Sequence, residues 1–306
     1  MAESYRVGRM TLGLHPPEGY RTHMPIHSPS RTRAAVARTL PELAAALAGR
    51  EDVALVPTMG ALHDGHRALL RAARRSSATV VMSLFVNPAQ FGPGEDFARY
   101  PRDEEADLAV ATAEGADLVF APGAETIYPE GFAATVDPGP LAGELEGRSR
   151  PGHFRGVATV VTRLFGLVQP QRAFFGEKDY QQLVIVRSVA RDLALGVEVV
   201  GVPTVREADG LALSSRNRFL SPAERERATT LNAGLRAAGR LYAAGEHDAR
   251  LLLDTARARL AMDPDYLELR RLGDLGAYDP DCPAILLVAA RLGTTRLIDN
   301  LTLEDA

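Results

Sequence analysis

Short apolar runs alternate with amphipathic patterns along the first two thirds of the chain. Five runs have the length and composition of short buried strands: 53–56, 79–86, 117–121, 173–175 and 197–202. The segments between them carry apolar residues at i, i+3, i+4 and i+7, which is the spacing of a helix with one buried face. This alternation predicts an α/β fold, a Rossmann-like doubly wound parallel sheet with helices on both faces.

Capping signals mark where several helices begin. Thr39-Leu-Pro-Glu42 and Ser221-Pro-Ala-Glu224 each place a hydroxyl at the N-cap and a glutamate three residues later, so that two backbone N–H groups gain partners. Gly49 follows the first of these helices as a stop signal. Further helices are predicted over 103–114 and 248–261.

The last third of the chain has a different order of elements. After Pro203, two helical patterns are followed by apolar runs at 266–270, 284–290 and 295–300. We therefore predict a poorly ordered extension over 1–33, a Rossmann-like domain over 34–203 and a smaller C-terminal α+β domain over 204–306. Residues 122–152 are too rich in proline and glycine for a prediction.

Charge and composition argue against several classes of protein. Thirty-five basic and 39 acidic side chains give a net charge of −4, which disfavours a nucleic-acid-binding protein. The single cysteine, Cys282, rules out an internal disulfide and a cysteine-based zinc site. No run reaches the roughly 18 apolar residues of a membrane helix, and the N-terminus lacks the apolar core of a signal peptide. We expect a cytoplasmic protein without a membrane partner.

The strand at 53–56 runs through Pro57 and Gly60 into a helix that begins at His63-Asp-Gly-His66. The first N–H groups of a helix lack internal partners and carry the positive end of its dipole, so this junction suits a phosphate. Gly65 leaves room for the anion, and His63 and His66 can donate ring N–H groups as charge builds on an attacked phosphorus. The alternatives are a capping or core role. A metal site is disfavoured because no cysteine or third histidine lies nearby.

Polar residues follow two more of the predicted strands. The run at 79–86 ends at Asn87-Pro-Ala-Gln90, and the run at 173–175 ends at Gly176-Glu-Lys178-Asp179. Ligands of parallel sheets bind outside the carboxyl ends of the strands. Lys178 offers a mobile charge for a phosphate, and Asp179 can receive a ribose hydroxyl or a metal-bound water. The alternatives are a plain turn and a solvated charge cluster.

Two loops are further candidates. Leu213-Ser214-Ser215-Arg216-Asn217 can supply several donors to a triphosphate and charge to a leaving pyrophosphate, or it can be a serine-rich turn. The polar loop 92–102 is long enough to act as a lid, or it can be an inert surface loop. His153 precedes a helix, and a capping role is sufficient to explain it.

Four of these blocks together resemble the pantothenate synthetase family, the pantoate:β-alanine ligases. That family belongs to the H-x-G-H nucleotidyltransferases related to class I aminoacyl-tRNA synthetases. The blocks are P-T-M-G-A-L-H-D-G-H, F-V-N-P-A-Q-F, F-F-G-E-K-D-Y-Q-Q-L and L-S-S-R-N, and the resemblance covers about residues 35–302. Leu213 stands where the family usually has methionine. If that residue contributes only backbone and apolar contact to adenine, leucine will serve; otherwise nucleotide affinity is in doubt.

The resemblance implies an ATP-dependent, AMP-forming ligase with Mg²⁺ that acts as a homodimer. It would condense (R)-pantoate with β-alanine to pantothenate through pantoyl adenylate, releasing pyrophosphate and AMP, with the C-terminal domain covering the ATP site. The implied catalytic residues are His63, His66, Lys178, Ser214, Ser215 and Arg216. The implied ATP-binding residues are Met59, Gly60, Ala61, Leu62, His63, Asp64, Gly65, His66, Gly176, Glu177, Lys178, Asp179, Val205, Leu213, Ser214, Ser215 and Arg216. The implied binding residues for pantoate and β-alanine are Gln90 and Gln182. Two other functions remain open, a different H-x-G-H nucleotidyltransferase and a nucleotide-binding regulator that has lost catalysis.

Overall fold

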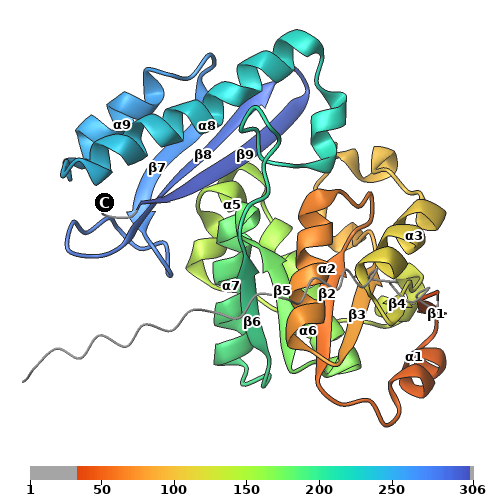
Figure 1. Ribbon diagram of the computed structural model, residues 1–306. Coiled ribbons are helices and arrows are strands. Elements are labelled where there is room, and N and C mark those ends of the chain that lie inside the picture. Colours follow the sequence, from red (N-terminus) through yellow and green to blue (C-terminus); the bar gives the residue numbers. More distant parts are fainter. Residues whose placement is uncertain (1–32, 304–306) are drawn as a thin grey trace, which may run out of the picture. The chain divides into compact units, whose positions relative to one another are not determined.

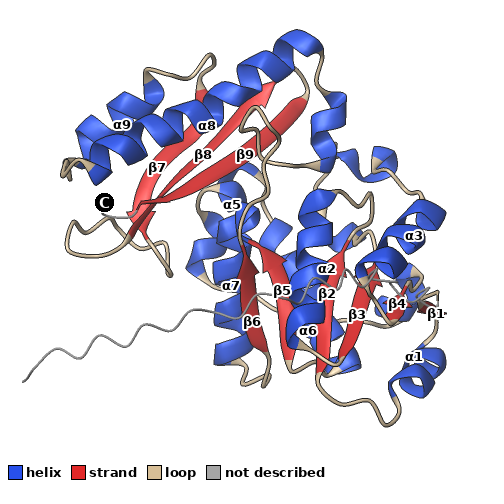
Figure 2. Ribbon diagram, in the orientation of Figure 1, coloured by secondary structure: helices blue, strands red, loops and turns tan. Residues whose placement is uncertain are grey.

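A computed structural model of the chain describes residues 33–303, so the predicted extension over 1–33 lies outside the described residues except for Arg33. Within this range six parallel strands form one sheet in the order β1-β4-β3-β2-β5-β6 (Figures 1 and 2). Their bounds are β1 Ala35–Ala37, β2 Val53–Thr58, β3 Thr79–Leu84, β4 Leu118–Phe120, β5 Arg172–Gly176 and β6 Glu198–Val202. The predicted parallel sheet is confirmed.

Helices cover both faces of this sheet. The helices α1 (Leu40–Leu47), α6 (His153–Val168) and α7 (Tyr180–Asp192) share one apolar core with the sheet. The helices α2 (Asp64–Ser76) and α3 (Glu104–Glu114) share another on the opposite face. The structure therefore has the doubly wound arrangement that the alternating pattern predicts. Within the described residues no helix combines the length and the apolar character needed to cross a bilayer.

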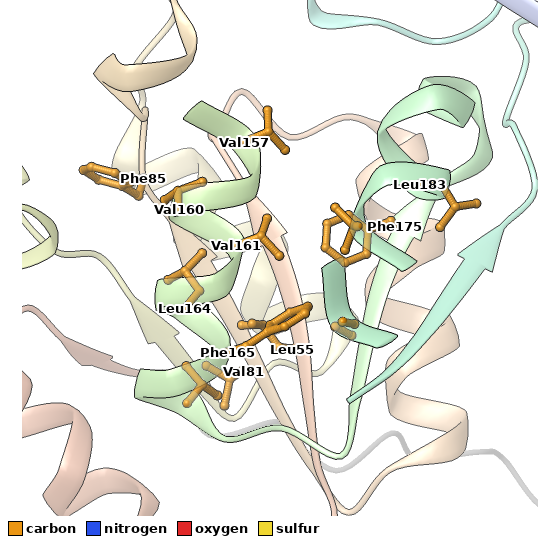
Figure 3. Packing of buried hydrophobic residues seen from close by; sticks show 14 of the residues in the cluster. Leu55, Val81, Phe85, Val157, Val160, Val161, Leu164, Phe165, Phe175 and Leu183 are labelled. Carbon is orange, nitrogen blue, oxygen red and sulfur yellow. The ribbon is translucent and has the colours of Figure 1, made fainter. Parts of the chain in front are cut away.

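The core under α6 explains why the strands of this sheet are apolar at nearly every position. Leu55 of β2 and Val81 of β3 are fully buried beneath Val161, Leu164 and Phe165 of α6 (Figure 3). A parallel strand with helices on both faces has no side exposed to water, so every position tends to be apolar. Polar side chains enter this part of the fold mainly where the strands end.

The C-terminal part contains a second, antiparallel sheet. Its strands β7 (Pro264–Arg271), β8 (Ala284–Leu292) and β9 (Thr295–Leu303) lie in sequence order. Helices α8 (Pro222–Ala243) and α9 (Ala249–Arg257) share a core with one face of the sheet. Ile285 and Leu287 of β8 join the core that contains α6 and α7. The smaller α+β part is thus confirmed, and its two buried faces explain the unbroken apolar run of β8. The boundary at Pro203 stays a prediction.

Local sequence signals predicted where the capped helices begin, but they did not predict the short elements. Thr39 and Ser221 form the predicted capping boxes with Glu42 and Glu224. The three-residue strand β1 was not predicted because three residues show no period. The segment for which no prediction was made contains α4 (Ala124–Ile127), the 3₁₀ turn η3 (Pro140–Gly143) and α5 (Glu146–Ser149). The other 3₁₀ turns are η1 Pro88–Gln90, η2 Asp96–Arg99, η4 Glu177–Asp179 and η5 Ser215–Phe219.

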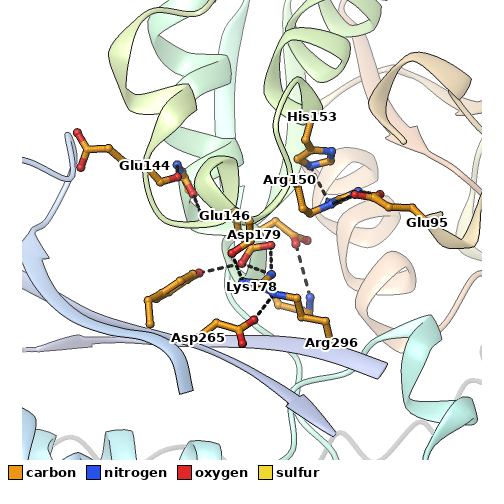
Figure 4. A network of polar contacts seen from close by, with 12 residues as sticks. Glu95, Glu144, Glu146, Arg150, His153, Lys178, Asp179, Asp265 and Arg296 are labelled. Carbon is orange, nitrogen blue, oxygen red and sulfur yellow. Dashed lines mark hydrogen bonds and ion pairs between the residues drawn. The ribbon is translucent and has the colours of Figure 1, made fainter. Parts of the chain in front are cut away.

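A buried ion pair joins the antiparallel sheet to α5. Arg296 of β9 contacts the Glu146 carboxylate, and the Tyr266 hydroxyl donates to the same carboxylate over 3.1 Å (Figure 4). Arg296 also contacts Asp265 at 2.6 Å, and Arg270 contacts Glu144 at 2.9 Å. The central pair of Arg296 with Glu146 depends on good geometry because both side chains are largely buried and have lost most of their water. It holds β9 in one register near the carboxyl ends of the parallel strands.

Gly156 allows the closest approach between α6 and η1. A Cβ atom at Gly156 would lie 2.1 Å from the backbone oxygen of Ala89, within η1. We therefore expect Gly156→Ala to lower the free energy of unfolding by about 1–3 kcal/mol through overpacking. Gly166→Ala in the same helix is the matched control, because a Cβ there meets nothing within 4 Å. That control should gain about 0.5–1 kcal/mol. Urea unfolding of both variants measures the difference, and equal stabilities would contradict the close contact.

Candidate active site

A cavity of about 240 Å³ opens at the carboxyl ends of β2, β3 and β5, next to α6. Most of the predicted site residues line it, although they come from four separate segments: Met59, His63, Gly65, His66, Gln90, Gly176, Lys178, Asp179, Gln182, Val205, Leu213, Ser214, Ser215 and Arg216. Five predicted ATP-binding residues do not line it: Gly60, Ala61, Leu62, Asp64 and Glu177. The fold therefore brings distant motifs together at the sheet edge where ligands of α/β proteins bind.

A second cavity of about 730 Å³ adjoins the first on the side of β9. Its wall includes Asp299 and Asn300 of β9, and residues shared with the first cavity form the boundary between the two. The shared residues are Arg150, His153, Lys178, Asp179, Gln182, Ser214 and Arg216. The cations of the site thus face both spaces.

The two histidines form a capping box at the N-terminus of α2. His63 Nδ1 accepts a hydrogen bond from the backbone N–H of Gly65 at 3.1 Å. His66 Nδ1 accepts one from the backbone N–H of His63 at 3.2 Å. An imidazole nitrogen that accepts carries no proton, so in the neutral ring the proton lies on Nε2. The capping interpretation is therefore confirmed. The phosphate interpretation stays a prediction that is compatible with it, because Nδ1 caps the helix while Nε2–H remains a donor.

Both rings are neutral at physiological pH. Burial, and then the nearby Lys178 charge, lower the pKa of His63 from 6.5 to about 4. Burial, and then His63, lower the pKa of His66 to about 3. The ring centroids lie 4.1 Å apart, so two positive charges here would repel strongly. Each ring offers one directed N–H group rather than a full charge.

The loop before His63 is held by a carboxylate that sequence reasoning missed. Asp107 of α3 is buried and accepts from the backbone N–H groups of Ala61 at 3.0 Å and Leu62 at 2.8 Å. Gly60 and Ala61 both have positive φ, and a Cβ at Gly60 would lie 2.6 Å from Asp107. These three loop residues, which do not line the cavity, therefore act through the shape of the loop itself. Asp107 lies 46 and 45 residues from Ala61 and Leu62, so no local pattern marks it.

Gly65 lies against the His63 ring as well as lining the cavity. A Cβ atom at Gly65 would lie 2.8 Å from that ring, so the small residue is needed for the imidazole to fold back onto the helix terminus. The expectation that Gly65 leaves room for an anion stays a prediction.

Asn87 orients the amide of Gln90. Asn87 Nδ2 donates to Gln90 Oε1 at 3.1 Å, and the Tyr128 hydroxyl donates to Asn87 Oδ1 at 2.7 Å. The oxygen of Gln90 is thereby occupied, and its Nε2 donates to the sulfur of Met59 at 3.0 Å. Gln90 can exchange that weak acceptor for a ligand oxygen. The Asn87-Pro turn is thus both a turn and a support for the site, and Tyr128 was missed because it lies in the segment without a prediction.

Arg150 connects the loop 92–102 to the cavity wall. Its guanidinium donates to both oxygens of Glu95, at 3.0 and 2.6 Å, and approaches His153 Nε2 at 3.0 Å (Figure 4). His153 Nδ1 contacts the backbone oxygen of Gln90 at 2.8 Å, so Nδ1 carries the proton and Nε2 accepts from Arg150. Gly152, not His153, is the N-cap of α6. The expected capping role of His153 is therefore wrong.

Lys178 and Asp179 lie at the turn η4, where β5 passes into α7. Lys178 Nζ is 3.5 Å from Asp179 Oδ1, and the Asp179 side chain is about half exposed, at 49%. Burial raises the pKa of Asp179, but Lys178 and Arg216 outweigh it and hold the pKa below its ordinary value. Ser214 is the N-cap of η5, and its Oγ accepts from the Arg216 N–H at 3.3 Å. The cavity thus combines an ionised carboxylate with cationic groups.

An apolar wall lies opposite these polar groups. It is formed by one face of α6 and by aromatic residues from β5 and the end of β3: Val157, Val160, Val161, Leu164, Phe85 and Phe175. A ligand with an apolar body and charged or hydroxylated ends fits such a cavity.

Comparison with known proteins agrees with this geometry. A family model described as pantoate-beta-alanine ligase matches residues 30–302. Pantothenate synthetase of Mycolicibacterium smegmatis is 56% identical over 262 residues, which cover 84% of this chain and 82% of that protein. Pantothenate synthetase of Nocardia farcinica is 55% identical over 253 residues, covering 81% and 78%.

Solved structures show the same relationship. Pantothenate synthetase of Thermus thermophilus superposes with a TM-score of 0.84 at 52% identity, covering 88% of this chain and 99% of that one. The pantoate-beta-alanine ligase of Francisella tularensis, solved in complex with beta-gamma ATP and β-alanine, has a TM-score of 0.74 at 30% identity, covering 89% and 99%. By sequence and by fold, this chain belongs to the pantoate-beta-alanine ligase family.

Proposed function

We propose that the protein joins pantoate to β-alanine at the expense of ATP, through a pantoyl adenylate, and releases pyrophosphate and AMP. The observation that carries this function is the paired Nε2–H donors at the N-terminus of α2, facing Lys178, Ser214 and Arg216 across one cavity. Membership of the family supports the identity of the acid and the amine. The complex of the Francisella tularensis relative supports ATP and β-alanine as ligands.

The first cavity suits the acid. Pantoate has a quaternary carbon with two methyl groups between a hydroxymethyl group and a hydroxy acid. The α6 wall offers apolar contact for the methyl groups, and Gln90 presents Nε2 donors because Asn87 occupies its oxygen. Gln182 lines the same cavity from α7 and can bind a second oxygen. The roles of Gln90 and Gln182 rest on this chemistry and on the family motifs.

The first step needs alignment and charge neutralisation rather than an activated side chain. A pantoate carboxylate oxygen attacks the α-phosphorus, and the bond to the pyrophosphate oxygen breaks. His63 and His66 donate Nε2–H groups to phosphate oxygens at the positive end of α2. Lys178, Ser214, Ser215 and Arg216 bind the β- and γ-phosphates as negative charge moves onto the leaving group. Alignment of the two reactants supplies a further part of the rate enhancement.

In the second step the neutral amine of β-alanine attacks the acyl carbon and AMP leaves with the bonding electron pair. The adenylate is a mixed anhydride, so water must be kept away until the amine arrives. Loop 92–102 can provide this protection, since the ion pair of Glu95 with Arg150 ties it to the cavity wall. β-Alanine releases its ammonium proton to solvent before attack, and the nitrogen releases a second proton to solvent as the amide forms and AMP leaves.

Mg²⁺ is expected to accompany ATP. Within residues 33–303 no group of three or more His, Cys, Asp or Glu side chains could hold a metal ion on its own. Mg²⁺ commonly binds through one or two carboxylates together with substrate phosphates, and the half-exposed, ionised Asp179 carboxylate fits that role. When bound, the ion would neutralise phosphate charge. The family resemblance also supports a homodimer, which equilibrium ultracentrifugation would measure. The single cysteine, Cys282, fits a reducing cytoplasm.

The adenylate step can be tested without the amine. We expect labelled pyrophosphate to exchange into ATP when pantoate and Mg²⁺ are present and β-alanine is absent, because the adenylate step is reversible. Omitting pantoate is the control. Exchange without pantoate would indicate another acid or another nucleotidyltransferase. No exchange by a folded, ATP-binding protein would indicate a different substrate or a nucleotide-binding protein without catalysis, and would contradict the proposed function.

Two substitutions at His66 distinguish its role in capping the helix through Nδ1 from its role as a hydrogen-bond donor through Nε2. In His66→Asn, the amide oxygen can replace Nδ1 as the acceptor for the His63 N–H, but nothing replaces Nε2. We expect pyrophosphate exchange to fall about 100- to 1000-fold, the usual effect of losing one oxyanion donor. His66→Gln places an amide N–H near the position of Nε2 and should retain more activity. Thermal unfolding should be similar for both variants. Wild-type exchange by the folded His66→Asn variant would exclude the donor role.

The histidines also predict how stability depends on pH. The folded protein protonates His63 and His153 only near pH 4 and His66 near pH 3, whereas the ordinary pKa is 6.5. Between these values the unfolded chain binds more protons, so the free energy of unfolding falls as the pH drops below about 6.5. Urea unfolding at several pH values measures this, and a variant with His63→Asn and His66→Asn should show a smaller pH dependence. Ring resonances that titrate near 6.5 in the folded protein would contradict it.

A further inference from the structure

Asn300 lies where β9 meets the turn that carries Lys178. Its Nδ2 donates to the backbone oxygens of Glu177 and Lys178, both at 2.9 Å. These are two successive carbonyls of η4, the turn between β5 and α7. The Asn300 side chain is buried, and no local motif connects it with Lys178, which lies 122 residues earlier. One amide group of the antiparallel sheet thus holds the backbone from which Lys178 reaches the cavity.

Asp299, next to Asn300, holds a second segment of the site, the hairpin that leads to Ser214. Asp299 is buried and accepts two hydrogen bonds from the Arg206 guanidinium, at 2.7 and 2.9 Å. Arg206 also donates to the backbone oxygen of Asn300 at 3.0 Å. Beyond Arg206, the backbone N–H of Leu213 donates to the oxygen of Val205 at 3.0 Å, in a narrow hairpin that leads directly into Ser214. Asp299 and Asn300 therefore link β9 to the segment that carries Lys178 and to the segment that leads to Ser214 and Arg216.

The position of β9 is itself well determined. Its Arg296 forms the buried ion pair with Glu146 shown in Figure 4, and its backbone pairs with β8 along its whole length. A rigid strand can locate a turn more accurately than a solvent-exposed loop can. The placement of Lys178 against a phosphate then depends on how the antiparallel sheet is docked.

We infer that Asn300 is a positioning residue for Lys178 and that Asp299 supports it through Arg206. This inference rests on the proposed function, since it assigns Lys178 to the ATP phosphates. Asn300 contacts the lysine turn and not the reacting atoms. Its removal would let η4 shift by a fraction of an ångström to an ångström, and misplacement on the order of 1 Å can lower a rate about 100-fold.

A double-mutant cycle tests this inference in the full-length protein. Asn300→Ala is expected to lower the rate of pantoate-dependent pyrophosphate exchange about 10- to 100-fold, with the KM for pantoate nearly unchanged. In the Lys178→Ala background the same substitution should change the rate by less than about 2-fold, because the group that it positions is gone. Asn300→Asp removes both N–H donors and places a carboxylate next to two carbonyl oxygens, which repel it. Its rate of pyrophosphate exchange should therefore be as low as that of Asn300→Ala or lower.

Thr302→Ala is the matched control, since it changes the same strand two residues further on and should leave the exchange rate unchanged. The inference would be overturned if the double variant lost exchange activity by the product of the two single-variant factors. A normal exchange rate in folded Asn300→Ala would also overturn it. If Asn300→Ala does not fold, Asn300→Ser takes its place in the cycle; failure of both to fold would assign Asn300 to stability and overturn the positioning role. Absence of exchange in the wild type would instead contradict the proposed function, so the two failures are distinguishable.

Discussion

The two hydrogen bonds that cap α2 control the chemistry of this site. They satisfy backbone N–H groups that would otherwise lack partners, and they also place the ring protons of His63 and His66 on Nε2. A single arrangement therefore completes the helix and aims two donors at its positive end. Burial keeps both rings neutral, so the site proposed to bind phosphate gains two hydrogen-bond donors without two further positive charges in a confined space. Positive charge at the site comes from Lys178, Arg216, Arg150 and the N-terminal end of the helix dipole.

The remaining parts of the site depend on contacts between segments far apart in the chain. Asp107 holds the loop before His63, Asn87 sets the orientation of the Gln90 amide, and Asn300 holds the turn at Lys178. Each contact uses a buried polar group whose partners are backbone or amide atoms. A buried polar group without a partner is costly, so these contacts are strongly directional. The groups that face the ligand are therefore supported by neighbours that the ligand does not touch.

The antiparallel sheet has a related structural role. One of its faces packs on α8 and α9, and residues of its other face belong to the same core as α6 and α7. The buried pair of Arg296 with Glu146 adds a contact whose geometry tolerates little change. The two cavities share a boundary formed by residues of α6 and α7, of the turns η4 and η5, and of the loop at Arg150. The ligand site therefore forms only when the antiparallel sheet packs against the part that contains the parallel sheet.

The sequence by itself determined the alternation of strands and helices, the capping boxes at Thr39 and Ser221, and the motifs at the strand ends, because these depend on period and on residues three or four apart. It also placed the chain in its family, since four motifs occur in one order. Tertiary structure alone decided the burial that keeps His63 and His66 neutral, and the partners Asp107, Tyr128 and Asn300. Burial depends on how distant segments pack, and the three partners lie 41 to 123 residues from the groups that they hold. Hydrophobic periodicity and short motifs report on residues close together in the sequence, so they cannot predict contacts over such separations.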